Sequence, residues 1–404
     1  MRVVIAGGGI AGLETVLALQ ELAGERVELT LAAPEADFTY KPLLVEEPFS
    51  TTQAERLALA PLVESVGGHF VQQALAVVRP EDRVVRLADG SELGYDALVV
   101  CVGARERSAF RDAATFRATG ERLPIDDLLR AAAEHSSRRI SFVVPPGATW
   151  PLPIYEVALM AKRRSAALGL DLEYEVVTPE EGPLIMFGPQ ASGAVASLLG
   201  GRGISVRAAV RADETDDGGI VLIPGHDRLE TGQIVALPVL EGRRIDGIPT
   251  DPDGFIPIDE HARVRGLDDV YAAGDGTNFP IKQGGLGTQQ ADAAAEHIAA
   301  RAGAELEPTP FHPVLRGKVL TGDDSLSLRA DVGGGGGEGV ASDDYLWWPP
   351  HKVAGRFLAA WLAGETPHDD LEPPSRPIDV EVSLPSEWHR EPMALDPYGP
   401  LGVD

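Results

Sequence analysis

A glycine pattern near the start of the chain, Gly7-x-Gly9-x-x-Gly12, constrains the fold more than any other feature. The apolar run Val3 to Ala6 before it is typical of a buried parallel strand, and the residues after it have the apolar spacing of a helix. A second apolar stretch, Arg26 to Ala32, completes a strand, helix, strand unit. Glycines at these positions permit a tight turn, the approach of a diphosphate to the backbone, and close packing of helix on strand. The sequence therefore predicts a dinucleotide-binding domain in this region.

The middle of the chain repeats this arrangement. Between Arg138 and about Pro249, apolar runs of strand length alternate with helical patterns, as in a parallel sheet covered by helices. We predict an α/β fold with two Rossmann-like, three-layer dinucleotide-binding domains and a C-terminal α+β segment. The predicted bounds are residues 1–110 together with 251–302 for the first domain, 135–250 for the second, and 303–404 for the C-terminal segment, which ends in an acidic, proline-rich tail.

Composition limits the chemistry that the chain can carry out. The formal net charge of −27 disfavours binding to nucleic acid or to an anionic membrane surface. Cys101 is the only cysteine, so a paired-cysteine redox site cannot form, and the histidines show no metal-ligand spacing. No apolar run approaches the ~20 residues that span a bilayer. We therefore expect a cytoplasmic protein with no metal, no nucleic-acid partner, no transmembrane segment and no peripheral membrane contact.

Further segments carry a resemblance to a known family. They are Tyr40-Lys41-Pro42-Leu43-Leu44, Tyr95 to Gly103, Tyr271-Ala272-Ala273-Gly274-Asp275, and Pro280 to Gly285 followed by Gln289-Gln290-Ala291-Asp292. With the glycine pattern, they make the chain resemble the FAD-dependent pyridine-nucleotide-disulfide oxidoreductase superfamily. Within it, the chain is most similar to the branch of sulfide:quinone oxidoreductase and flavocytochrome c sulfide dehydrogenase, with type II NADH dehydrogenases as near relatives.

This resemblance implies FAD as the cofactor. By position, Asp275 would bind the ribityl chain of FAD, and the helix that begins near Leu286 would direct its N-terminus at the flavin pyrimidine. Lys282 is a candidate for stabilising the reduced flavin, with an exposed surface lysine as the alternative. Glu35 is a candidate for the adenosine ribose, although Ala33 occupies the usual place of that acid. The predicted cofactor-binding residues are Gly7, Gly9, Ile10, Ala11, Gly12, Glu35, Lys41, Pro42, Gly103, Gly274, Asp275, Lys282, Gln283 and Gly284.

The chain also departs from this family. Sulfide oxidation in that branch uses two or three cysteines beside the flavin, whereas Cys101 lies in a predicted strand, where a cysteine is most often a small core residue. In the second domain, the strand Ile140 to Val144 runs into the proline-rich stretch Pro145 to Pro153 instead of a second glycine pattern. Prolines remove backbone donors, so the cradle for an NAD(P)H diphosphate is poor.

These observations favour one function and leave others open. We predict an FAD-dependent oxidoreductase that passes electrons from an unidentified small-molecule donor to a quinone or similar acceptor, without the cysteine-dependent sulfide mechanism. The alternatives are an NAD(P)H:acceptor oxidoreductase and a non-catalytic flavin-binding scaffold. The aromatic run Trp347 to Pro350 and the helical pattern after it fit either a quinone slot or ordinary core packing. The sequence leaves open whether the chain forms a homodimer.

Overall fold

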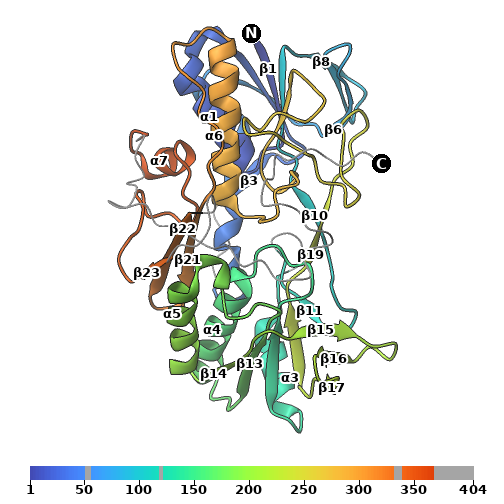
Figure 1. The fold of residues 1–404 in the computed structure, drawn as a ribbon, viewed down its shortest axis with the longest axis vertical. Helices are drawn as coiled ribbons and strands as arrows, with labels where there is room; N and C mark the ends of the chain where they lie inside the picture. Colours follow the sequence, from blue (N-terminus) through green and yellow to red (C-terminus); the bar gives the residue numbers. More distant parts are fainter. Residues whose placement is uncertain (51–55, 118–121, 332–338, 368–404) are drawn as a thin grey trace.

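Two parallel β-sheets, one in each of two lobes stacked along the long axis of the molecule, organise the chain (Figure 1). The computed structural model describes residues 1–50, 56–117, 122–331 and 339–367. The loop expected at Gly333 to Gly337 and nearly all of the acidic tail lie outside the described residues.

The sheet of the first lobe has the strand order β5-β2-β1-β9-β20. Its strands are β1 (Arg2–Ala6), β2 (Glu28–Ala32), β5 (His69–Val71), β9 (Ala97–Val100) and β20 (Val270–Ala272). Every pairing is parallel, and β1 lies between β2 and β9. Because the chain moves outward from β1 in both directions, the carboxyl end of β1 is a topological switch point, where open α/β sheets bind their ligands.

Two helices that are far apart in sequence cover this sheet together. Helix α1 (Ile10–Ala23) follows the glycine pattern, and α6 (Gly284–Arg301) follows the late strand β20. They lie side by side (Figure 1), and buried residues of both helices share one hydrophobic cluster with the sheet. Residues near 275 are thereby brought back to the first strand of the chain.

The second lobe repeats this plan, with the strand order β14-β13-β12-β18-β11 and only parallel pairings. Its strands are β11 (Ala114–Thr115), β12 (Arg139–Val143), β13 (Glu173–Val177), β14 (Ile204–Arg207) and β18 (Gln233–Ala236), and its helices are α3 (Ile125–Glu134), α4 (Leu152–Ala167) and α5 (Pro189–Gly201). The predicted α/β fold class is therefore confirmed.

Small antiparallel units complete the two lobes. A meander of β6 (Leu75–Arg79), β7 (Val84–Leu87) and β8 (Glu92–Gly94) packs beside the first sheet, and β15 (Arg211–Glu214), β16 (Ile220–Ile223) and β17 (Asp227–Arg228) form a sheet in the second lobe. The chain crosses between the lobes in β10 (Ala104–Arg107) and β19 (Val239–Gly242), which pair with each other. Near the site, β3 (Asp37–Thr39) pairs with β4 (Arg56–Ala58), and short helices occupy Lys41–Val45 and Leu59–Ser65.

The C-terminal segment forms a three-stranded antiparallel sheet between the lobes, followed by a short helix (Figure 1). The strands are β21 (Val314–Leu320), β22 (Ser325–Asp331) and β23 (Val340–Ser342), and the helix is α7 (Leu358–Ala363). The helical pattern expected directly after Pro350 therefore yields a helix that begins only at Leu358. The reason lies in α1: the buried Glu14 carboxylate accepts the N–H groups of Phe357 (2.8 Å) and Leu358 (2.7 Å) and so caps α7 at its first residues.

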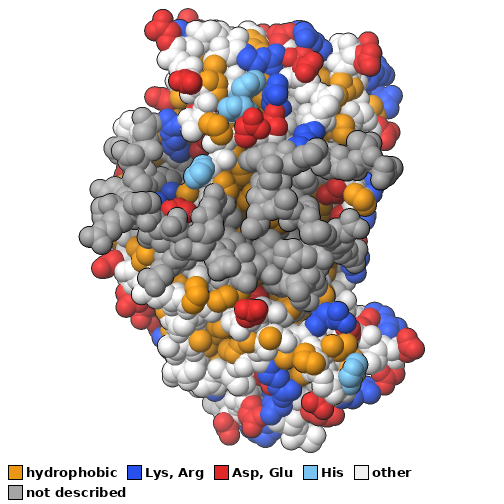
Figure 2. All heavy atoms as spheres, viewed as in Figure 1, with side chains coloured by type: hydrophobic (Ala, Val, Ile, Leu, Met, Phe, Trp, Pro, Cys, Tyr) orange, Lys and Arg blue, Asp and Glu red, His pale blue; other side chains and the backbone are white. Residues whose placement is uncertain are grey.

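The surface carries both signs of charge despite the acidic total. Lys and Arg side chains are interleaved with Asp and Glu over both lobes on the face shown in Figure 2. None of the helices in the described ranges combines the length and apolar character that crossing a membrane requires.

We predict that G12A disrupts the first lobe, because a Cβ on Gly12 would lie 1.8 Å from the Gly7 carbonyl oxygen. Relieving that overlap would cost at least ~1–3 kcal/mol of unfolding free energy. Urea denaturation of purified protein measures this loss. The control is G193A in α5, where no atom lies within 4 Å of the added Cβ. An alanine there should be neutral or stabilise by roughly 0.5–1 kcal/mol, and equal stability of G12A and the wild type would contradict the prediction.

Candidate functional site

The glycine pattern forms a turn at the carboxyl end of β1 that only glycine can make. Gly7 has φ +117°, and a Cβ on it would lie 2.2 Å from the carbonyl oxygen of Cys101. Gly9 differs, because a Cβ there would meet no atom within 4 Å. Its α-carbon faces open space at the start of α1, where the helix N-terminus favours an anion. A diphosphate can therefore approach the backbone at Gly9, and a side chain there would fill that space.

Residues 274–284 pack against the start of α1, next to this turn. A Cβ on Gly274 would lie 3.2 Å from the Ala11 Cβ, and a Cβ on Gly284 would lie 3.2 Å from Ile10 Cδ1. A Cβ on Gly276 would likewise lie 3.2 Å from the carbonyl oxygen of Gly103. Residues that the sequence predicted separately, at positions 10–11, 103, 274 and 284, are therefore brought to one place.

Asp275 and Lys282 form the charged part of this site. Lys282 is buried, its ammonium lies 3.9 Å from the centre of the Phe255 ring, and it donates a hydrogen bond to the carbonyl oxygen of Thr277. Burial lowers the pKa of Lys282 to about 7, against the attraction of Asp275 and Asp251. The alternative of an exposed surface lysine is therefore wrong.

The Asp275 carboxylate is available to a ligand. Burial raises its pKa, while the positive charges of Lys282 and Lys41 oppose the shift. Within the described ranges, neither carboxylate oxygen of Asp275 takes part in a hydrogen bond or an ion pair of 4.0 Å or less. An acceptor that is attracted by two lysine charges and has no hydrogen-bond donor suits a hydroxyl-rich ligand such as a ribityl chain.

The remaining predicted residues divide into internal and outward-facing ones. Gln283 uses its side chain within the protein, since its Oε1 accepts the Leu286 N–H at the start of α6 (2.8 Å) and its Nε2 donates to the Arg316 carbonyl (3.0 Å). Lys41 and Pro42 begin the short helix Lys41–Val45, with Lys41 exposed. Glu35 is exposed just beyond the carboxyl end of β2, with no contact that marks it as a ligand.

Cys101 is a core residue. It is buried beside Thr15, with 4.0 Å between Sγ and Oγ1, and burial raises the pKa of its thiol to about 12. A thiol of that pKa is not ionised at neutral pH, so it lacks the thiolate that redox chemistry requires. Elsewhere in the described ranges, no group of three or more His, Cys, Asp and Glu residues is placed to hold a metal ion.

The corresponding edge of the second sheet is closed by its own side chains. Glu180 follows β13, where a Rossmann domain that binds NAD usually places its ribose acid. Here it is buried and accepts hydrogen bonds from the hydroxyls of Tyr155 (2.6 Å) and Thr178 (2.9 Å). The strand β12 leads into Pro145 and Pro146 before α4 begins at Leu152. The second lobe thus offers neither a glycine cradle nor a free acid at this edge.

A buried ion pair that the sequence did not predict joins the second lobe to the C-terminal segment. Lys352 Nζ lies 2.7 Å from Glu156 Oε2 in α4, and both side chains are buried. Burial lowers the pKa of Lys352 and raises that of Glu156. The adjacent Val353 N–H donates to the Tyr40 hydroxyl (2.7 Å), and Val353 also contacts Gly284. Glu156 is a charged residue within the apolar stretch of α4, and this position could have indicated a buried partner of opposite charge.

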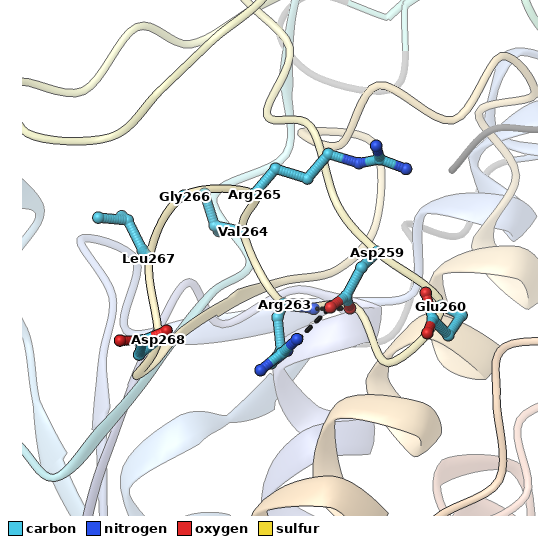
Figure 3. Close-up of a pocket in the computed structure, with 8 residues that line it drawn as sticks. All are labelled: Asp259, Glu260, Arg263, Val264, Arg265, Gly266, Leu267 and Asp268. Atoms are coloured by element: carbon cyan, nitrogen blue, oxygen red, sulfur yellow. Dashed lines mark hydrogen bonds and ion pairs between the residues drawn. The ribbon is translucent and has the colours of Figure 1, made fainter. Parts of the chain in front are cut away.

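A surface hollow at Asp259 to Asp268 lies away from this site (Figure 3). It precedes β20 and so lies at the amino end of that strand, opposite the edge where the glycine turn sits. Its Arg263 and Asp259 pair with each other at 2.8 Å. Since ligands of parallel sheets bind beyond the carboxyl ends of the strands, we assign this hollow no role.

Known proteins resemble the chain in part of its sequence and most of its fold. No family model matches it. Over 105 residues it is 30% identical to the mitochondrial sulfide:quinone oxidoreductase of Dictyostelium discoideum, a match that covers 25% of this chain and 23% of that protein. The sulfide:quinone oxidoreductase of the hyperthermophilic bacterium Aquifex aeolicus has a TM-score of 0.73 at 19% identity, covering 82% of this chain and 83% of that chain.

Other reductases share the fold at lower similarity. An NAD-dependent persulfide reductase from A. fulgidus has a TM-score of 0.58 at 17% identity and covers 81% of this chain and 64% of that chain. A ferredoxin reductase from Rhodopseudomonas palustris has a TM-score of 0.58 at 22% identity and covers 82% of this chain and 83% of that chain. The predicted resemblance to sulfide:quinone oxidoreductase is therefore confirmed.

We predict that E180Q changes how stability depends on pH. Burial raises the pKa of Glu180 to about 7 in the folded protein, from 4.5 for a free glutamate. Between these values the folded state binds more protons than the unfolded state, so the wild type loses stability as pH rises through this window. Glutamine has no such dependence. Relative to the wild type, E180Q should gain up to about 3 kcal/mol between pH 4.5 and pH 8.

Denaturant unfolding of both proteins across this pH range provides the measurement. Other buried acids, including Glu14, titrate in both proteins and cancel in the difference. A difference that stays constant with pH would contradict the burial of Glu180 as an acid.

Proposed function

We propose that this chain, with the fold of sulfide:quinone oxidoreductase and a partial sequence match to one such enzyme, is an FAD-dependent oxidoreductase. Bound FAD would supply two-electron chemistry, taking electrons from a small-molecule donor and passing them to a quinone or similar acceptor. The observation that carries the proposal is the convergence of the open glycine turn, the unpartnered Asp275 and the buried Lys282 at one sheet edge. We assign residues 1–110 and 251–302 to the FAD-binding domain, 135–250 to the second Rossmann-like domain and 303–404 to the interface segment.

Each part of FAD has matching residues. The diphosphate would lie against the backbone at Gly9, and Asp275 would accept a hydrogen bond from a ribityl hydroxyl. The N-terminus of α6 begins at Gly284, capped by Gln283, and its positive end favours negative charge on a bound ring. With a pKa of about 7, Lys282 is partly protonated at neutral pH, and in its protonated form it adds positive charge to the same place.

The position of the C-terminal segment supports a quinone acceptor. The segment carrying Lys352 and Val353 packs against Tyr40 and the start of α6, so it borders the proposed flavin site. Quinone reduction consumes protons, and the Lys352 and Glu156 pair holds one in a buried place. Burial lowers the pKa of Lys352 and raises that of Glu156, so the two values lie closer together than in water. The free-energy difference for moving a proton between the two side chains is therefore smaller. We propose that Lys352 Nζ donates a proton to the acceptor.

Reduction by NAD(P)H is the second candidate, because NAD-dependent persulfide reductase has the same fold. The proline loop after β12 and the inward-facing Glu180 argue against it here. Stopped-flow mixing of the flavin-loaded protein with NADH and with NADPH separates the two: rapid bleaching of the flavin band would favour the NAD(P)H enzyme.

We predict that recombinant protein is yellow with about one FAD per chain, and that G9A and D275A weaken FAD retention at least about tenfold. G9A fills the space for the diphosphate, and D275A removes a carboxylate acceptor. Absorbance spectra and dialysis against FAD-free buffer measure retention. D251A is the matched control. It also removes a carboxylate near Lys282, but Asp251 is not among the predicted cofactor-binding residues. Folded wild-type protein that binds no FAD after reconstitution would refute the proposed function.

We predict that K352M slows reoxidation of the reduced protein by a soluble quinone about a hundredfold, the usual effect of losing a proton donor. Stopped-flow absorbance after photoreduction provides the rate, and FAD content confirms the fold. K352M leaves the Glu156 carboxylate buried without a partner, which can destabilise the fold. The double variant K352M/E156Q removes both charges, so it tests the loss of Lys352 without that destabilisation. K162M, which alters a lysine on the Tyr174 ring, is the control. Unchanged rates in both Lys352 variants would contradict this role.

A further inference from the structure

Two arginines lie opposite each other on the antiparallel pair β21 and β22. The register places Arg316 against Arg329, with Lys318 against Ser327 and Val314 against Asp331 as neighbours on the same sheet face. The opposite face carries Leu315, Val319, Leu328 and Ala330, which belong to the hydrophobic core of the second lobe. One face of this sheet is therefore core, and the other carries three cations and one acid.

The Arg316 guanidinium is buried without a counter-charge in contact. The residue is 7% exposed, and its Nε has no hydrogen-bond partner. Within the described ranges, the side chain of Arg316 forms no hydrogen bond and no ion pair. Burial and the neighbouring charge of Arg329 lower its pKa to about 10, with Asp331 opposing, so Arg316 stays charged at neutral pH. Arg329 is itself only 8% exposed.

The burial of Arg316 opposite Arg329 lowers the free energy of unfolding. A buried charge without a partner is strongly unfavourable, and like charges directly opposite each other across two strands repel. The chain has 62 acidic residues against 35 basic ones, so acids to pair with were plentiful. An anion that enters from outside the chain would remove the cost.

The backbone of Arg316 borders the proposed flavin site. The Arg316 carbonyl accepts the hydrogen bond from Gln283, the residue that caps α6. On the same face, Lys318 donates to the Pro350 carbonyl (3.2 Å) and its ammonium lies 5.2 Å from the centre of the Tyr345 ring. Lys318 is thus held by the segment that also carries Lys352, which leaves Arg316 as the cation without a partner.

We propose that Arg316 binds the oxyanion group, a carboxylate or a phosphate, of a small ligand at this face of the sheet. The planar guanidinium fork matches both groups and binds them through paired N–H donors. If the proposed redox function holds, on which this step rests, the ligand is the electron donor, because a neutral quinone offers no negative charge to neutralise Arg316. The donor would then be an anionic small molecule. The anion site itself does not depend on the flavin.

Anion-dependent thermal stability tests this site. The full chain, with and without FAD, is titrated with inorganic phosphate and with succinate, against chloride at equal ionic strength. We expect a saturable rise in Tm for the wild type with at least one of these two probes. R316M should bind that probe at least about tenfold more weakly. Without anions, R316M should be as stable as the wild type or more stable, because it removes an uncompensated buried charge.

R164M is the control, since Arg164 is paired with Asp126 at 2.6 Å. It should keep the anion response of the wild type. An absent response in the wild type, an equal response in R316M, or an R316M protein that is unstable or unfolded would overturn the proposal, the last by giving Arg316 a structural role. An Arg316-dependent response in a protein that binds no FAD would refute the redox function and leave the anion site standing.

Discussion

The close approach of α1 to the strands beneath it is the constraint on which the rest of the structure depends. Gly7 and Gly12 let the helix begin against the backbone of Cys101 and of Gly7 itself, where any side chain would overlap. From this position the first turn of α1 touches Gly274 and Gly284, about 270 residues later in the chain. The same contacts therefore hold the lobe together and assemble the proposed cofactor site.

Buried charge recurs where the C-terminal segment meets the two lobes, and each case has a different physical basis. Glu14 accepts backbone N–H donors, which oppose the rise of its pKa to about 7 on burial, and Lys352 pairs with the carboxylate of Glu156. Arg316 has a cation opposite it instead. Because a buried group tolerates its charge only when something neutralises it, the first two cases explain how the segment is fastened, and the third points to a ligand.

The two lobes share one sheet topology but have different roles. The first keeps open space at the edge of its sheet, while the second fills the equivalent edge with prolines, Tyr155 and Glu180. Its apolar core instead supports β21, where the face opposite the arginines packs. We interpret the second lobe as a platform that positions the C-terminal sheet and Glu156 beside the proposed flavin site.

The sequence alone determined the local features: the strand, glycine turn and helix at the start, the second unit of the same kind, and the burial expected for Cys101. These depend on residue periodicity and on backbone geometry that only glycine permits, both of which are readable over short stretches. It did not determine the state of Lys282 or the length of α7, and it missed the Lys352 and Glu156 pair and the facing arginines. Those depend on which residues, distant in sequence, meet in the folded chain, because desolvation and charge pairing are set by neighbours that only the tertiary structure supplies.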